Sequence, residues 1–179
     1  MKTKEITKVG LIAAIYVVLT LVFAPISYGH IQLRISEALT LLPFYLGYPA
    51  VLGLFIGVML ANIAGGFGLI DIIFGSLITL IAAVFTARAR SLYTAGIYPV
   101  VFNALGVGLI LFFLQGFRPI SPVVDEITFF SRDIAHFINS FVNYLVYVFF
   151  VGIGQTGAVY FIGLPLMKLL NTKLDLENM

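Results

Sequence analysis

The sequence predicts an all-α, polytopic membrane protein that forms a single transmembrane domain over residues 1–179, and three observations carry this prediction. Hydrophobic residues make up 61% of the chain and charged residues only 10%, whereas soluble domains carry about a quarter charged residues. The mean hydropathy is +1.10. Apolar segments long enough for membrane helices recur along the whole chain, and short stretches rich in glycine, proline or charge separate them.

The first apolar segment is expected to be a retained transmembrane helix from about Ile6 to Ala24, which stops at Pro25. Lysines precede this segment, as they precede the apolar region of a signal peptide. No small-x-small cleavage site follows it, however, and hydrophobic segments continue toward the C-terminus. We therefore interpret the segment as the first of six transmembrane helices.

The other five helices are separated by sequences that break helices. We expect them at approximately Arg34–Gly47, Pro49–Ala64, Asp71–Ala87, Leu92–Leu114 and Ile134–Leu170. The separators are the loop Pro25–Leu33, the turn Gly47–Pro49, the run Gly65–Gly68, the turn Arg88–Ser91 and the polar loop Gln115–Asp133. The last region is too long for one straight span, and glycines at Gly152–Gly157 interrupt it. We expect a flanking helix joined to the sixth span there, or a kink.

The distribution of charge predicts the orientation of the chain in the membrane. Six helices place both termini on one side, and basic residues concentrate on the cytoplasmic side. With cytoplasmic termini, the inner side carries Lys2, Lys4, Lys8, Arg88, Arg90, Lys168 and Lys173, and the outer side carries only Arg34, Arg118 and Arg132. The sequence thus predicts a multi-pass protein of the cell membrane with both termini in the cytoplasm. Its polar chemistry is concentrated in the outer half of the bundle.

A polar segment, His30–Leu39, interrupts the apolar sequence and points to a functional site. It reads H-I-Q-L-R-I-S-E-A-L, and a charge at the depth of the bilayer costs at least about 2.5–3.5 kcal/mol. Arg34 and Glu37 are three positions apart, so on a helix they share a face. One interpretation is an ion pair that caps the helix near the interface. The other directs one or both side chains toward a ligand.

Further polar residues fall within or at the ends of the expected helices. Asn62 ends one helix and Asp71 begins the next, on the same outer side as Glu37. Each has a plain structural interpretation, since Asp71 suits a helix N-terminus and Asn62 can satisfy freed backbone carbonyls. Their convergence with Glu37 favours a pocket. Asn103 and Gln155 lie inside later helices, where an amide either bonds a neighbouring helix or contacts a ligand.

Several chemistries have no matching residues in this sequence. Without cysteine, the chain forms no disulfide, no thiolate metal site and no cysteine nucleophile. The motifs G-x-x-x-x-G-K-[ST] and H-E-x-x-H are absent, and no nucleophile–base pair is recognisable. We therefore expect no enzyme, no metal, no cofactor bound by this chain and no nucleic-acid partner. The expected partners are the lipid bilayer and a small molecule.

The first helix carries a face of small residues, Gly10-x-x-x-Ala14 with Ala13 beside it. Faces of this kind let two helices approach closely. Packing within the bundle and docking of a partner protein both fit the pattern.

Four groups of residues together carry a family resemblance, namely Gln32-x-Arg34-x-Ser36-Glu37-Ala38-Leu39, Ala61-Asn62, Asp71–Leu77 and Pro99…Asn103. They resemble the QueT family, whose members are substrate-binding (S) components of energy-coupling-factor (ECF) transporters for queuosine precursors such as pre-queuosine-1. The resemblance covers nearly the whole chain. It implies a six-helix S-component fold with cytoplasmic termini. It also implies three partner subunits, a transmembrane coupling protein and two cytoplasmic ATPases, and ATP is used by the ATPases.

The resemblance further implies that Gly10, Ala13 and Ala14 form the face that docks on the coupling protein, where the family usually has Ala-x-x-x-Ala. The implied substrate-binding residues lie in an outer-side pocket and are Gln32, Arg34, Glu37, Asn62, Asp71, Asn103 and Gln155. The loops Pro25–Leu33 and Gln115–Asp133 are expected to close over this pocket.

One residue departs from the family pattern and bears on the substrate. The last helix of the family carries Gly-Glu where this chain has Gly154-Gln155. An amide supplies one acceptor and no charge, so Glu37 and Asp71 are left to supply the negative charge that a cationic precursor needs. The departure leaves the S-component assignment standing and admits, as an alternative, an S component for another vitamin or nucleobase-like solute. A second alternative, from another class and independent of this residue, is a membrane scaffold that transports nothing.

Overall fold

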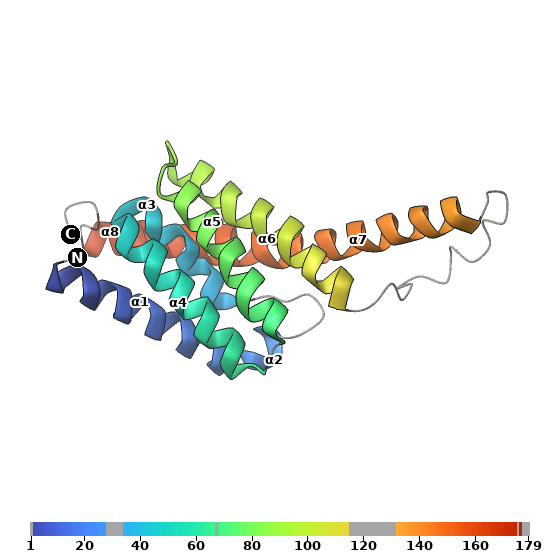
Figure 1. Cartoon of the computed structure of the whole chain (residues 1–179). Coiled ribbons are helices and arrows are strands. Elements are labelled where there is room, and N and C mark those ends of the chain that lie inside the picture. The colour runs from blue at the N-terminus through green and yellow to red at the C-terminus, as the bar shows by residue number, and fades with distance from the viewer. Residues whose placement is uncertain (1, 28–33, 67, 115–131, 175, 177–179) are drawn as a thin grey trace.

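The computed structural model describes residues 2–27, 34–66, 68–114, 132–174 and 176. All regular structure within these ranges is helical, which confirms the all-α prediction. The helices form an elongated bundle, and α1 (Thr3–Val22) begins at the same end of it where α8 (Leu164–Leu174) ends (Figure 1). This arrangement agrees with the prediction that both termini lie on one side.

Between α1 and α8 the chain forms helices of three windings. The α-helices are α2 (Ala24–Ser27), α3 (Leu42–Leu46), α4 (Tyr48–Ala64), α5 (Ser76–Thr86), α6 (Leu92–Leu114) and α7 (Arg132–Thr156). The segment η1 (Ile35–Leu41) is a 3-10 helix, and η2 (Asp71–Gly75) and η4 (Gly157–Gly163) are π-helices. The predicted helices at Arg34–Gly47 and Asp71–Ala87 therefore each combine two windings.

The end of the first helix differs from the prediction that it stops at Pro25. Helix α1 ends at Val22, and α2 then runs through Pro25 to Ser27. Pro25 is the second residue of α2, and in the first turn of a helix a proline needs no partner for its missing N–H. The proline thus lies within a new short helix and does not terminate the old one.

The last helical region differs from the prediction at its glycines. The chain passes from α7 into η4 and α8 without a break, so that Ser140–Leu174 is one apolar helical segment. The helix continues through the glycine-rich stretch and changes from α to π winding at Gly157. The first turns of α7 project beyond the ends of the other helices (Figure 1).

The apolar helices support a multi-pass membrane protein. In the part of the chain that the structure describes, three helices are long and apolar enough to cross a membrane, at Thr3–Val22, Leu92–Phe113 and Ser140–Leu174. At most a third of the most apolar stretch of each is buried inside the protein. Shorter apolar helices cover Ile35–Leu46, Tyr48–Ala64 and Asp71–Thr86. Exposed apolar surface of this extent suits a lipid environment. The number of six spans and the cytoplasmic termini stay predictions.

Helices α1 and α4 approach closely because α4 has glycine at the contact. A Cβ atom built on Gly57 lies 2.9 Å from Cβ of Tyr16 and 3.2 Å from Cα of Ala13. A Cβ atom on Gly53 lies 2.9 Å from Cβ of Ile12. Tyr16 is fully buried by this packing. The glycines of α4 thereby set the position of Tyr16 relative to the rest of the bundle.

This contact predicts that Gly57→Ala destabilises the fold. The added methyl group overlaps Tyr16, and overpacking of this kind costs about 1–3 kcal/mol. Gly10→Ala is the matched control, since a Cβ on Gly10 meets nothing within 4 Å. Thermal unfolding in detergent, followed by circular dichroism, measures both variants. Equal melting temperatures for the two variants would contradict the close α1–α4 contact.

The short helix η1 lies in the centre of the bundle and brings polar groups there. Its residues from Ser36 to Leu41 are all buried. It packs against η4, where a Cβ on Gly163 would lie 2.9 Å from the carbonyl oxygen of Ala38. A buried 3-10 helix of mostly apolar residues presents its three polar side chains, Ser36, Glu37 and Thr40, to protein groups and not to lipid.

Candidate functional site

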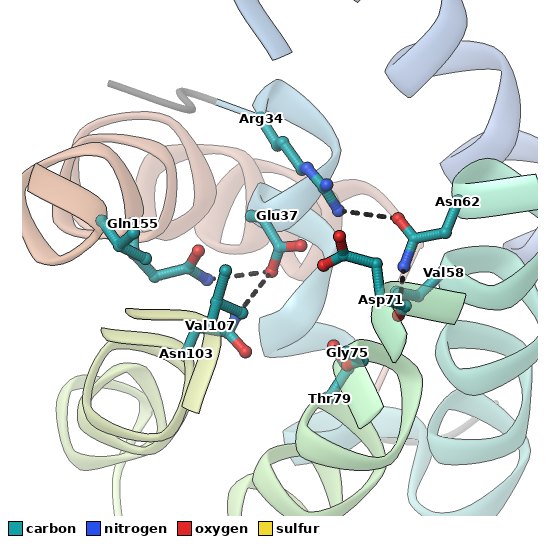
Figure 2. Close-up of a pocket in the computed structure, with 11 residues that line it drawn as sticks. Arg34, Glu37, Val58, Asn62, Asp71, Gly75, Thr79, Asn103, Val107 and Gln155 are labelled. Atoms are coloured by element: carbon teal, nitrogen blue, oxygen red, sulfur yellow. Dashed lines mark hydrogen bonds between the residues drawn. The ribbon is translucent and has the colours of Figure 1, made fainter. Parts of the chain in front are cut away.

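A small polar cavity lies where six helical elements meet. Its lining residues are Arg34, Glu37, Val58, Asn62, Asp71, Gly75, Thr79, Asn103, Val107, Val151 and Gln155 (Figure 2). The structure thus brings together six of the seven residues that the sequence singled out as substrate-binding. The seventh, Gln32, lies outside the described residues. The binding role of all seven stays a prediction.

Glu37 is the common acceptor of the cavity. Its side chain is 4% exposed, and its Oε1 accepts a hydrogen bond from the Tyr16 hydroxyl. Its Oε2 accepts from Nδ2 of Asn103 at 3.2 Å and from Nε2 of Gln155 at 2.9 Å (Figure 2). A buried carboxylate is tolerated only when such donors replace its hydration. Glu37 therefore links helices α1, α6 and α7 through one side chain.

A second hydrogen bond joins α1 to η1 beside Glu37. Thr20 is fully buried, and its hydroxyl lies 2.7 Å from the hydroxyl of Ser36 and 2.8 Å from the carbonyl of Tyr16. Tyr16 and Thr20 are one helical turn apart, on the face of α1 that is buried at Ile12 and Ala13. This spacing is the sequence signal from which the roles of Tyr16 and Thr20 could have been predicted.

Arg34 lies before the first turn of η1, so the intrahelical ion pair considered for Arg34 and Glu37 does not have the expected helical geometry. Its Nη1 donates to Oδ1 of Asn62 at 3.2 Å. Nδ2 of Asn62 donates in turn to the backbone carbonyl of Asp71 at 3.1 Å. Asn62 thus satisfies a backbone carbonyl, as its structural interpretation proposed, and also faces the cavity.

Asp71 presents its carboxylate to the cavity. It is the first residue of the π-helix η2 and is 8% exposed. The side chain makes no capping bond, and it accepts no hydrogen bond from the described part of the chain. In Figure 2 the carboxylate points toward the guanidinium of Arg34, to which it is attracted electrostatically. The Asp71 carboxylate therefore has acceptor capacity that no donor among the described residues uses.

Five lining residues were missed by sequence reasoning, namely Val58, Gly75, Thr79, Val107 and Val151. Gly75 has a steric reason to be small, because a Cβ there would lie 3.3 Å from Nδ2 of Asn62. Thr79 donates its hydroxyl to the Gly75 carbonyl at 3.2 Å. The valines carry no signal in a chain this apolar.

The cavity is narrow in this structure. Measured for the centre of a water molecule, its volume is about 30 Å³, which is room for one or two waters. A planar bicyclic ligand is several times larger, so its binding requires the cavity to widen. The Arg34–Asn62 hydrogen bond joins two lining residues of the cavity (Figure 2) and is one contact that such widening could break.

The three residues of α1 that are expected to dock a partner differ in their exposure. Ala13 is buried against α4, whereas Gly10 and Ala14 are exposed. Ala13 therefore packs within the bundle, whereas Gly10 and Ala14 are accessible. A docking role for the three stays a prediction. The loops expected to cover the pocket, Pro25–Leu33 and Gln115–Asp133, lie largely outside the described residues.

Within the described residues, no group of three or more histidine, cysteine or acidic side chains is placed to hold a metal ion. The site consists instead of carboxylates, amides and one guanidinium. Such a set binds small molecules through charge-assisted and neutral hydrogen bonds.

Comparison with known proteins assigns the chain to a family. The sequence model of a family described as QueT transporter matches residues 6–172. The chain is also 38% identical over 82 residues to the queuosine precursor transporter QueT of Lactococcus lactis subsp. cremoris (strain MG1363). That match covers 45% of this chain and 47% of the relative, so it spans about half the length of each. No solved structure matches the chain. The matched family is one of transporters, which confirms the expectation that the chain is not an enzyme. This chain belongs to the QueT transporter family.

Proposed function

We propose that the chain is the substrate-binding S component of an ECF-type importer and that it binds a queuosine precursor, a pre-queuosine-1-like deazapurine, for ATP-driven uptake. The observation that carries this proposal is the cavity itself. Two carboxylates, three amides and one guanidinium from separate helices converge in a bundle that is otherwise apolar. Membership in the QueT family and the name of the Lactococcus relative support the choice of substrate.

The charge of the cavity suits a cationic ligand. Among its described lining residues, Glu37 and Asp71 oppose one guanidinium, that of Arg34, which leaves one net negative charge. A buried net charge is stabilised by an ion of opposite sign. Pre-queuosine-1 carries a single ammonium group on its aminomethyl arm, and binding it neutralises the site.

The uncharged part of the ligand suits the amides. The guanine-like ring has two adjacent N–H donors and a carbonyl acceptor on one edge. Carbonyl oxygens of Asn62, Asn103 and Gln155 accept from such donors, and Arg34 donates to the ring carbonyl. Exclusion of water from the closed site strengthens each of these bonds.

Transport requires partners that supply energy. In this proposal the loaded S component docks on a transmembrane coupling protein through the small-residue face at Gly10, Ala13 and Ala14, with cytoplasmic termini and an outward pocket. Two cytoplasmic ATPases then hydrolyse ATP, and this hydrolysis reorients the S component. The exposed Gly10 and Ala14 leave room for a helix to approach α1.

Ligand screening tests this function. Pre-queuosine-1 at about 100 times its dissociation constant is expected to stabilise the purified chain by about 2.7 kcal/mol. Thermal unfolding is followed by circular dichroism, because the chain has neither tryptophan nor cysteine for the usual fluorescent reporters. Purines, pterins and B vitamins serve as comparison compounds.

The alternatives give other results. Stabilisation by one of the comparison compounds but not by a deazapurine identifies an S component for a different solute. A membrane scaffold retains no small molecule detectable by mass spectrometry and is not stabilised by any compound. Co-purification with an ATPase complex argues against the scaffold.

A further inference from the structure

The hydrogen bonds of Glu37 leave it little capacity for a ligand. A carboxylate accepts about four hydrogen bonds, and three protein donors already bind this one, from Tyr16, Asn103 and Gln155. Two of the three share the single oxygen Oε2. Asp71, by contrast, accepts none from the described residues. The two carboxylates of the cavity are therefore in different situations.

The donors on Glu37 determine how the two amides are oriented. A side-chain amide has an NH₂ group at one end and a carbonyl oxygen at the other. Because Asn103 and Gln155 both direct NH₂ to Oε2 of Glu37, their carbonyl oxygens are directed away from it. Oδ1 of Asn103 is buried and has no hydrogen-bond partner, although the residue lines the cavity. A buried carbonyl without a partner is unfavourable, and an N–H donor on a ligand would satisfy it.

Tyr16 holds this arrangement in place from outside the cavity. It is 0% exposed, and its Cβ packs closely against Gly57 of α4. Its hydroxyl donates to the oxygen of Glu37 that the amides do not use. The hydroxyl thus keeps Oε2 turned toward Asn103 and Gln155.

We infer that Tyr16 is a positioning residue of the ligand site. Through Glu37 it fixes the amides of Asn103 and Gln155 as hydrogen-bond acceptors, so that the site selects a ring edge with two adjacent N–H donors. Asp71 is left to bind the cation of the ligand. The inference rests on the proposed function and divides its two carboxylates between two tasks. Glu37 sets specificity without carrying the charge of the ligand, and Asp71 carries it.

The test compares pre-queuosine-1 with an analogue that lacks the exocyclic amine. The analogue leaves one amide carbonyl unpaired, so the wild-type chain is expected to bind it about 10- to 100-fold more weakly. In Tyr16→Phe the ring still packs against α4 but the hydroxyl is lost, and in Glu37→Gln the new amide can donate as well as accept. Both variants let the side-chain amides of Asn103 and Gln155 rotate so that their NH₂ and carbonyl ends exchange places. Both are therefore expected to reduce the ratio of the two dissociation constants, analogue over pre-queuosine-1, about tenfold. Calorimetric titration of both ligands in detergent measures the ratio.

Tyr144→Phe is the matched control, because it removes a tyrosine hydroxyl that bonds the Leu105 carbonyl away from the cavity. It is expected to leave the ratio unchanged. A purely structural role of Tyr16 lowers stability or weakens both ligands equally, and an unchanged ratio in Tyr16→Phe and Glu37→Gln overturns the inference. If Tyr16→Phe does not fold, the ratio of the two affinities in Glu37→Gln alone tests the inference. Wild-type chain that binds neither ligand overturns the proposed function itself, and this role with it.

Discussion

Asp71→Asn is expected to lower the affinity of the purified chain for pre-queuosine-1 by about 100-fold. The carboxylate is 8% exposed and accepts no hydrogen bond from the described residues, so it is available for the ligand ammonium. Replacing it with an amide removes the net negative charge of the cavity lining and leaves a buried ammonium without its ion-pair partner. Loss of one partner of a buried charge pair costs about 2–5 kcal/mol of binding free energy.

Calorimetric titration in detergent measures this effect, with two controls. An analogue without the aminomethyl arm has no ammonium, and Asp71→Asn is expected to change its affinity far less. Glu5→Gln removes the same charge from the first turn of α1 and is expected to change neither affinity. An equal loss for both ligands in Asp71→Asn would show that Asp71 supports the site without pairing with the cation.

Glu37→Ala is expected to destabilise the folded chain by about 3–5 kcal/mol. The truncation leaves three donors without their acceptor, those of Tyr16, Asn103 and Gln155, at a position that is 4% exposed. Removing the centre of a buried hydrogen-bonded network has a cost of this size, because each orphaned group loses its partner without regaining water. Thermal and denaturant unfolding followed by circular dichroism measure the loss.

Asp71→Asn is the informative comparison for stability as well. It also removes a buried carboxylate of the cavity, but no donor among the described residues depends on that side chain. It is therefore expected to leave stability unchanged or to raise it, since a buried charge is relieved. If Glu37→Ala unfolds at the same temperature as Asp71→Asn, Glu37 is not the centre of the network. Together the variants separate a carboxylate that holds the bundle from one that holds the ligand.

The narrow cavity also bears on how a ligand is held. The cavity has room for one or two waters. Some of its polar groups bond each other, as Arg34 does with Asn62, whereas Oδ1 of Asn103 has no partner among the described residues. A ligand would therefore exchange some contacts of the empty site for its own and would also satisfy groups that lack a partner without it.

Sequence reasoning found the polar members of the site because they stand out in an apolar chain. Glu37, Asn103 and Gln155 each lie among hydrophobic residues, where a polar group has to find a partner. Tyr16 and Thr20 were missed because tyrosine and threonine are common in membrane helices and carry no charge. The lining valines were missed for the opposite reason, since a cavity-facing valine and a lipid-facing one look alike in sequence.

The local windings were beyond sequence reasoning for a different reason. Asp71 was expected to begin an ordinary helix, and it begins a π-helix in which its backbone carbonyl accepts a hydrogen bond from Asn62. Glu37 was expected on an α-helix and lies on a 3-10 helix. A change of winding depends on which hydrogen bonds the neighbouring helices offer, and those neighbours are distant in the chain.

By itself the sequence determined the class of protein and the set of groups that need partners. Long apolar segments separated by helix-breaking stretches favour membrane helices, in which the backbone polar groups bond within their own segment. Only the tertiary structure decided which partner each group takes. Gln155 reaches Glu37 across 118 positions and Asn103 reaches it across 66. Hydrogen bonds form within about 3 Å in space, so the different hydrogen-bond environments of Glu37 and Asp71, on which the proposed division of tasks rests, follow from how the helices pack.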